Sequence, residues 1–169
     1  MKPRQRVLPA GCALALLAAL AGCAGYDGGN LLPGQSTSAE VEKSMGQPAE
    51  RRAGANGETV LWFPRLPYGR ASYAARIGAD GRLVAVEQRL TRENFDTLKP
   101  GLSRASDVRD VLGPPHRIDN FPRHQRDAWS YPAQEVVSML IVVQISPDDV
   151  VREAYMVNDP AVQAMDGPQ

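Results

Sequence analysis

The chain has 169 residues, 43% of them hydrophobic and 22% charged, and its 19 Lys and Arg balance 19 Asp and Glu. A chain of this length holds one domain or two very small ones. The lack of a basic excess argues against a nucleic-acid binder, because such proteins usually carry a basic surplus or patch.

The first 22 residues have the layout of a secretory signal. Basic residues at positions 2, 4 and 6 precede an almost uninterrupted Ala/Leu run at 12–20. Leu20-Ala21-Gly22-Cys23 then resembles the lipobox of bacterial lipoproteins. The resemblance implies cleavage before Cys23, a diacylglycerol on its sulfur and an acyl chain on its new amino group. A plain cleaved signal is the alternative, whereas the apolar run is shorter than the ~20 residues of a membrane-spanning helix.

Cleavage before Cys23 would remove 22 of the 169 residues and leave 147, with 16 Lys and Arg against 19 Asp and Glu. Cys12 would leave with residues 1–22 and lipid would occupy Cys23, so we expect neither a disulfide nor a free thiol. Residues 23–30 would form a tether. In the lipoprotein sorting system that this signal resembles, aspartate after the acylated cysteine causes retention in the inner membrane. Ala24 therefore implies an outer-membrane location, facing the periplasm.

A repeat with an offset of 67 residues organises the rest of the chain. The motif Leu31-Leu32-Pro33-Gly34-Gln35-Ser36 returns as Leu98-Lys99-Pro100-Gly101-Leu102-Ser103. The same offset relates Val41 to Val108, Met45 to Leu112, Gly46 to Gly113, Pro48 to Pro115 and Trp62 to Trp129. We therefore divide the chain into repeat 1, residues 31–91, and repeat 2, residues 92–160, followed by a tail, residues 161–169.

Each repeat begins with signals for a turn and a short helix. Pro-Gly predicts the turn, and Ser36 or Ser103 follows as the expected N-cap residue. Apolar residues one turn apart then predict a helix with one apolar face. Gly46 and Gly113 come next as expected C-terminal caps with positive φ. A further helical turn is expected only in repeat 2, at residues 92–98.

Three strands are predicted after each helix, because β-branched and aromatic residues gather there between turn signals. They span 58–63, 72–77 and 82–90 in repeat 1, and 126–131, 136–145 and 150–157 in repeat 2. The predicted fold class is α+β, with two tandem repeats. Each would be a short helical element followed by a three-stranded antiparallel meander, with the helices on one sheet face. The two sheets could join into one curved surface.

Two further features of the strands carry expectations. Trp62 and Trp129 hold matching positions, so each is expected to pack under its own helix, the alternative being a binding role. The apolar run at 136–145 is interrupted only by Ser138 and Gln144. Such a run predicts a central strand, or one whose second face contacts a partner.

The order of these motifs resembles the SmpA/OmlA (BamE-like) family of outer-membrane lipoproteins: Pro-Gly-x-Ser, then Val, then Gly-x-Pro, and then a strand with Trp. The resemblance covers most of residues 31–160 and implies a non-enzymatic accessory of outer-membrane protein assembly or of envelope integrity. BamE resembles one copy of the pattern, whereas this chain has two. The tandem arrangement also resembles the β-lactamase inhibitor protein fold. That second resemblance implies the alternative function, an inhibitor or modulator of a periplasmic enzyme, although fold likeness alone does not confer activity.

Motifs of common enzyme chemistry are missing from the sequence. It has no Gly-x-Ser-x-Gly and no glycine-rich phosphate loop ahead of a helix. His116, Asp119, His124 and Asp127 could together bind a metal, because imidazole and carboxylate groups are common ligands. Their spacing matches no metal motif, which favours a solvated polar loop. We therefore predict no enzyme activity, no metal and no cofactor.

Arg65, Tyr68, Arg70 and Tyr73 mix cations and aromatic rings in one loop and the strand after it. This mixture is enriched at protein interfaces, so the four are candidate binding residues, the alternative being an ordinary loop surface. The sequence thus predicts a lipid-anchored binding or scaffold protein. Its expected partners are the outer membrane, through the lipid, and other envelope proteins, with no nucleic acid.

Overall fold

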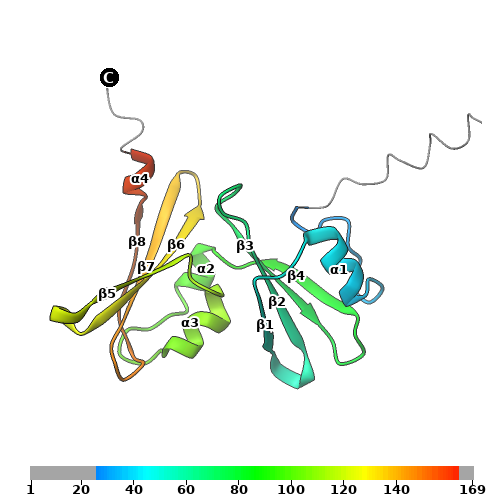
Figure 1. The fold of residues 1–169 in the computed structure, drawn as a ribbon, viewed down its shortest axis with the longest axis horizontal. Coiled ribbons are helices and arrows are strands. Elements are labelled where there is room, and N and C mark those ends of the chain that lie inside the picture. The colour runs from blue at the N-terminus through cyan, green and yellow to red at the C-terminus, as the bar shows by residue number, and fades with distance from the viewer. Residues whose placement is uncertain (1–25, 164–169) are drawn as a thin grey trace, which may run out of the picture.

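The structure is a computed structural model that describes residues 26–163 (Figure 1). Two units follow one another, each with short helices ahead of a four-stranded antiparallel sheet, which confirms the α+β class and the tandem arrangement. The first unit consists of α1 (Ser38–Met45), β1 (Glu50–Ala53), η2 (Ala55–Gly57), β2 (Thr59–Pro64), β3 (Ser72–Ile77) and β4 (Leu83–Gln88). The second consists of α2 (Arg92–Phe95), α3 (Ala105–Leu112), β5 (Arg117–Phe121), η3 (Pro122–His124), β6 (Arg126–Gln134), β7 (Ser138–Ile145), β8 (Val151–Asn158) and α4 (Pro160–Gln163).

Each sheet has four strands where three were predicted, and the additional strands are β1 and β5, at one edge of each sheet. The sequence of β1, Glu50-Arg51-Arg52-Ala53, has three charged residues and no β-branched or aromatic one. It becomes a strand by pairing its backbone with β2, with Glu50 opposite Trp62 and Ala53 opposite Thr59. Charged side chains suit an edge strand because they oppose pairing with other chains. Intrinsic strand propensity therefore did not reveal it.

The start of each helix differs from the sequence prediction. Ser36 is not the N-cap of α1; its Oγ accepts from the Leu32 N–H at 3.0 Å and closes the preceding turn. Thr37 is the N-cap, and its N–H donates to the Glu40 carboxylate at 2.7 Å. The second unit repeats both hydrogen bonds. The Lys99 N–H donates to Ser103 Oγ, and the Arg104 N–H donates to the Asp107 carboxylate. The predicted glycines do end the two helices with positive φ, 90° at Gly46 and 83° at Gly113.

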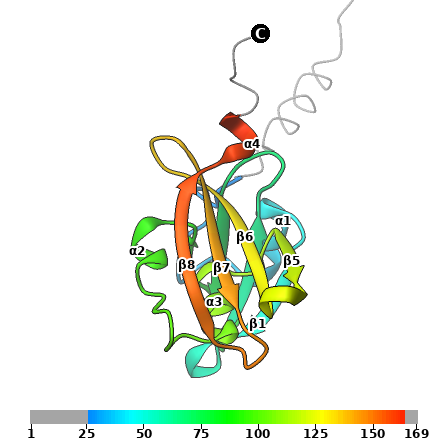
Figure 2. The same cartoon turned by 90° about the vertical axis from the view of Figure 1, so that its left-hand side faces the viewer.

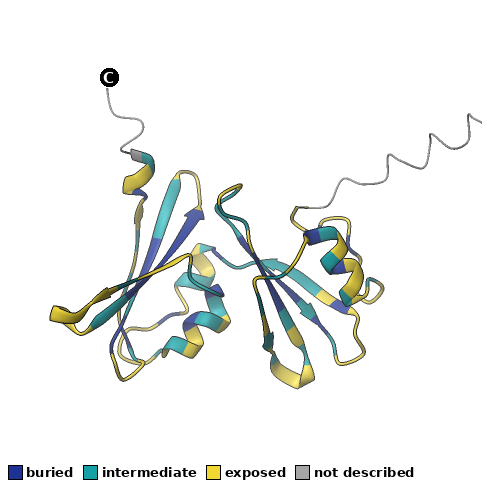
Figure 3. Cartoon of the chain, in the orientation of Figure 1, coloured by how far each residue is buried: buried dark blue, intermediate teal, exposed yellow. Residues whose placement is uncertain are grey.

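Each unit has its own hydrophobic core between its helix and one face of its sheet. In the first unit, Val41 and Met45 of α1 pack with Leu61, Phe63, Ala75, Ile77 and Leu83. In the second, Val108 and Leu112 of α3 pack with Trp129, Tyr131, Ala133, Ile141, Val143, Ile145 and Val151. Figure 3 shows the buried residues concentrated along the central strands of both sheets. None of the helices within residues 26–163 has the length and hydrophobicity of a membrane span.

We call the face of each sheet that points away from its own helix the back face. The back face of the first sheet is covered, because α2 and α3 lie between the two sheets (Figures 1 and 2). Arg109 of α3 pairs with Glu50 at 2.8 Å, and Asp110 of α3 pairs with Arg52 at 2.9 Å. The expectation that the sheets join into one curved surface is therefore wrong. Instead α1, the first sheet, the α2/α3 pair and the second sheet form successive layers.

Trp62 and Trp129 do not occupy equivalent positions. Glu50 lies opposite Trp62, whereas Arg117, 67 residues later, lies opposite Ser130, 68 residues after Trp62. The second unit thus has one more residue than the first between these paired positions, in the hairpin between β5 and β6. A shift of one residue along a strand moves a side chain to the other face of the sheet. Trp129 packs in the core under α3, as predicted. Trp62 instead lies on the back face of the first sheet, 2% exposed, against the end of α3.

Candidate binding surface

Arg65, one of the four predicted binding residues, has a structural role in the first unit. Its guanidinium carbon lies 4.9 Å from the ring centroid of Tyr26, 5.4 Å from that of Phe63 and 5.8 Å from that of Tyr73. Its Nη1 donates to the Met45 carbonyl at 2.9 Å. Burial lowers the pKa of Arg65 and raises the pKa of Tyr73. These contacts hold the start of the described chain and the end of α1 on the β2–β3 hairpin.

Arg70 and Tyr68 point elsewhere. Arg70 pairs with Asp159, at the end of β8, and its Nε donates to the Ala133 carbonyl at 3.3 Å, so it links the two units. Burial lowers the pKa of Arg70. Tyr68 is 89% exposed at the tip of the β2–β3 loop. The four residues therefore do not form one exposed patch, and Tyr68 is the member with a free surface.

The second cluster from the sequence, His116, Asp119, His124 and Asp127, is divided between different surfaces. Asp119 and His124 line one groove, His116 lines a neighbouring hollow, and Asp127 lines a third. Asp127 accepts from the Asn120 side-chain amide at 2.6 Å. Within residues 26–163, no group of three or more His, Cys, Asp and Glu side chains is placed to hold a metal ion. The lipidation prediction at Cys23, with the signal at 1–22, lies outside the described residues.

No helix within residues 26–163 covers the back face of the second sheet, which is hollowed by a groove of about 440 Å³. Small or aliphatic residues form its floor, with Ala128, Ser130 and Val142 each at most 8% exposed. Phe121 and Tyr155 stand beside them, 47% and 40% exposed. The complete lining is Arg117, Asp119, Phe121, His124, Arg126, Ala128, Ser130, Leu140, Val142, Gln144, Glu153 and Tyr155.

A smaller hollow of about 310 Å³ continues the groove toward the end of β8. The two share Arg117, Ser130 and Leu140, so they form one continuous surface. The smaller hollow is bounded by Leu66 from the β2–β3 loop of the first unit and by Pro160 of α4. The two units thus both contribute to this surface.

The groove exists because the second sheet has small residues where the first has large ones. With the pairing offset of 68, Ser130 takes the place of Trp62 and Ala128 that of Val60. In the first unit the indole of Trp62 fills the corresponding space and packs on α3. In the second unit no element of residues 26–163 covers this position. A sheet face that is closed by a helix in one unit is open in the other.

Only an indirect signal for this surface is present in the sequence. The apolar run at 136–145 predicted a central strand, or one whose second face contacts a partner. The central position is confirmed, because β7 lies between β6 and β8. Leu140 and Val142 line the groove on the back face, and their contact with a partner stays a prediction. The remaining lining residues are mostly polar, small or charged and are scattered over β5, η3, β6, β7 and β8, so no local pattern marked them.

Comparison with known proteins leaves the chain without a family assigned by sequence. No family model matches it, and no curated protein matches it by sequence. Among solved structures, a DUF4309 family protein (YjgB) from Bacillus subtilis is similar, with 17% sequence identity, 78% of this chain and 84% of that chain covered, and a TM-score of 0.32. A TM-score of this size does not establish a shared fold.

Proposed function

We propose that the chain is a lipid-anchored outer-membrane protein that faces the periplasm, binds another protein through the back face of its second sheet and catalyses no reaction. The open groove on that face is the observation that carries the proposal. The signal and the lipobox-like Cys23 support the location. The SmpA/OmlA resemblance favours a role in outer-membrane protein assembly or envelope integrity.

The composition of the back face supports protein binding. Small and aliphatic side chains of the central strands β6 and β7 lie at its centre, and the aromatic and charged side chains of the edge strands β5 and β8 lie around them. An apolar centre with a polar rim is the usual anatomy of a protein interface. Phe121, Tyr155 and Val157 are 47%, 40% and 41% exposed, although residues of this size usually bury most of their area. Tyr68 is the residue of the loop cluster that can join such a contact.

Site-specific photo-crosslinking tests the binding surface in the intact envelope. A photo-reactive amino acid at Tyr155 should form a crosslink to a defined partner protein. The same amino acid at Val84, a 38% exposed apolar position on β4 of the first unit, serves as the matched control. Crosslinks at Tyr155 to no protein, or to the same proteins as at Val84, would remove the back face from the proposal.

The anchor is tested separately by intact mass. The mature protein should begin at Cys23 and carry the additional mass of acyl chains. Cys23→Ser should give a precursor or a water-soluble product, because the thiol is the acceptor for the lipid. A wild-type product without acyl mass would contradict the membrane location while leaving the binding surface unaffected.

A further inference from the structure

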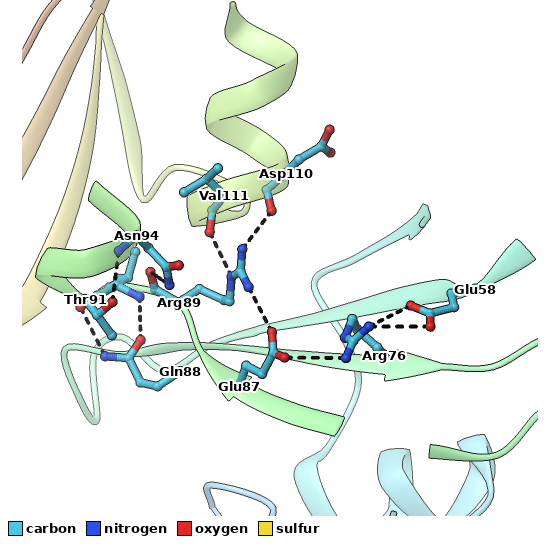
Figure 4. A network of polar contacts seen from close by, with 10 residues as sticks. Glu58, Arg76, Glu87, Gln88, Arg89, Thr91, Asn94, Asp110 and Val111 are labelled. Carbon is cyan, nitrogen blue, oxygen red and sulfur yellow. Dashed lines mark hydrogen bonds and ion pairs between the residues drawn. The ribbon is translucent and has the colours of Figure 1, made fainter. Parts of the chain in front are cut away.

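The first sheet shows how its back face accepts a helix. α3 places Arg109 against Glu50 at 2.8 Å and Asp110 against Arg52 at 2.9 Å. Arg89 donates from Nε to the Val111 carbonyl at 2.9 Å, near the end of the same helix (Figure 4). Two ion pairs with opposite polarity, side by side, therefore fix the position and direction of the docked helix.

The back face of the second sheet has the same two charged positions with their signs reversed. Arg117 takes the place of Glu50, and Asp119 takes the place of Arg52, each 67 residues later on the edge strand. Arg117 and Asp119 pair with each other at 2.8 Å, with side chains that are 68% and 36% exposed. A helix that docks here in the orientation of α3 needs an acidic residue followed by a basic one.

Helix α1 of the first unit has that order of charges. α1 and α3 are related by the offset of 67, so Glu42 takes the place of Arg109 and Lys43 that of Asp110. Lys43 is exposed, and Glu42 is half-buried and pairs with Arg51 at 2.6 Å. The charges of α1 are thus opposite to those of α3, and the charges of the open sheet face are opposite to those of the first sheet. The charges of α1 and of the open face therefore complement one another.

We propose that the back face of the second sheet binds helix α1 of a second copy of this chain, with Glu42 against the partner copy's Arg117 and Lys43 against its Asp119. This inference names the partner at the proposed binding surface and so rests on the proposed function. The contact is head to tail, because different surfaces of the two copies meet. Such contacts continue into rings or open chains rather than stopping at a dimer.

The β6–β7 hairpin supports the same continuation. In the first unit, the corresponding β2–β3 loop reaches the next unit, where Arg70 contacts Asp159 and the Ala133 carbonyl. In the second unit the hairpin contacts no further unit, and its tip exposes Val136 fully and Val137 by 51%. Within residues 26–163, the back face and the β6–β7 hairpin of the second unit are therefore both uncovered, and both expose apolar side chains.

The Arg117–Asp119 pair does not prevent this exchange, because it lies at the surface, where an ion pair contributes little to stability. Glu42 accepts from both Nη1 and Nη2 of Arg51, so its approach to Arg117 competes with that pair, whereas Lys43 is exposed. Gly46, at the end of α1, has no atom within 4 Å of the position of a Cβ, so the helix end is accessible. Because Gly46 and Ser130 are both small, the new contact lacks the tight packing of Trp62 against Gly113. The association is therefore weaker than the internal one, and a shared membrane favours it by concentrating the copies.

Disulfide crosslinking of the full-length, lipid-anchored protein tests the geometry. The double variant Lys43→Cys with Asp119→Cys should give a ladder of dimers, trimers and larger products on a non-reducing gel. Each single variant should stay monomeric, since only one half of the contact then carries a thiol. Dimers of Asp119→Cys alone would mean that two back faces meet each other, and they would overturn the head-to-tail proposal.

Charge reversal tests the chemistry, using the sedimentation of the detergent-solubilised protein over a concentration series. Lys43→Glu or Asp119→Lys should weaken self-association about tenfold, which corresponds to ~1.4 kcal/mol, and the double variant should restore it. Lys99→Glu, an exposed lysine in the turn before α3, is the matched control and should leave association unchanged. Equal association in all variants would overturn the proposal.

The outcome also separates this inference from the proposed function. A monomeric protein that still crosslinks from Tyr155 to a different envelope protein would refute self-association and leave the binding function standing. A monomeric protein without any specific crosslink from Tyr155 would refute both.

Discussion

The glycines that end α1 and α3 allow the contact between the two units to be measured with a matched pair of substitutions. Both have positive φ, 90° at Gly46 and 83° at Gly113, so an alanine has a similar backbone cost at each. Their surroundings differ. A Cβ on Gly46 would meet no atom within 4 Å, whereas a Cβ on Gly113 would lie closer than 3.0 Å to Cε3 of Trp62.

The expected losses in the free energy of unfolding follow from these different surroundings. With ψ of −170° at Gly46 and −161° at Gly113, both glycines lie in a backbone region that is nearly exclusive to glycine. A residue with a Cβ there costs about 1–3 kcal/mol, and this is the whole cost expected for Gly46→Ala. Overpacking adds about 1–3 kcal/mol, because the Trp62 ring is buried. Gly113→Ala should therefore destabilise the chain by about 2–6 kcal/mol. For a chain of this size each kcal/mol lowers Tm by about 2–4 °C.

Urea unfolding followed by circular dichroism measures both variants. The double variant Gly113→Ala with Trp62→Leu should lose less stability than the two single variants added together. The reason is that leucine is smaller than tryptophan and relieves the overlap with the new Cβ of residue 113. Equal losses for Gly46→Ala and Gly113→Ala, with additive behaviour in the double variant, would refute the packing of Trp62 on the end of α3.

Two further predictions concern single side chains. Trp62→Ala and Trp129→Ala should each lower the free energy of unfolding by about 3–5 kcal/mol. Calorimetry should resolve two unfolding transitions only for Trp62→Ala, because Trp62 joins the two units whereas Trp129 belongs to one core. Burial raises the pKa of Tyr131 well above its ordinary value of 10.0, so the folded state keeps the neutral phenol. The resulting stability is fully present below pH 10 and is lost as the pH rises above it. Tyr131→Phe should flatten the fall of the urea midpoint above about pH 10; an unchanged slope would contradict this assignment.

The sequence was a good guide wherever the signal was local and repeated. The offset of 67 places α1 and α3 correctly, at Ser38–Met45 and Ala105–Leu112, and both glycines have the predicted positive φ. Residues 72–77 form β3 with the predicted bounds. The edge strand β1 was missed because its charged residues pair through the backbone with β2, and a backbone hydrogen bond leaves no trace in residue type.

The faces of the strands were harder to predict than the strands. One additional residue between β5 and β6 reverses the side on which a tryptophan lies, and the alignment of Trp62 with Trp129 concealed it. The candidate binding surface was missed for a related reason. Its floor, Ala128 and Ser130, is made of small residues whose importance lies in the space they leave, and this appears only when the sheet and its neighbours are seen together.

The layering explains what the second unit adds. A single unit of this build would leave the back face of its only sheet open. Here the first back face is closed by α3 through Trp62, Glu50 and Arg52, and the open face is that of the second sheet. Because Ser130 replaces the tryptophan and both charges are reversed, this open face cannot accept the partner of the first. Within residues 26–163 the tandem arrangement therefore leaves one back face open, with charges opposite to those of the face that α3 closes.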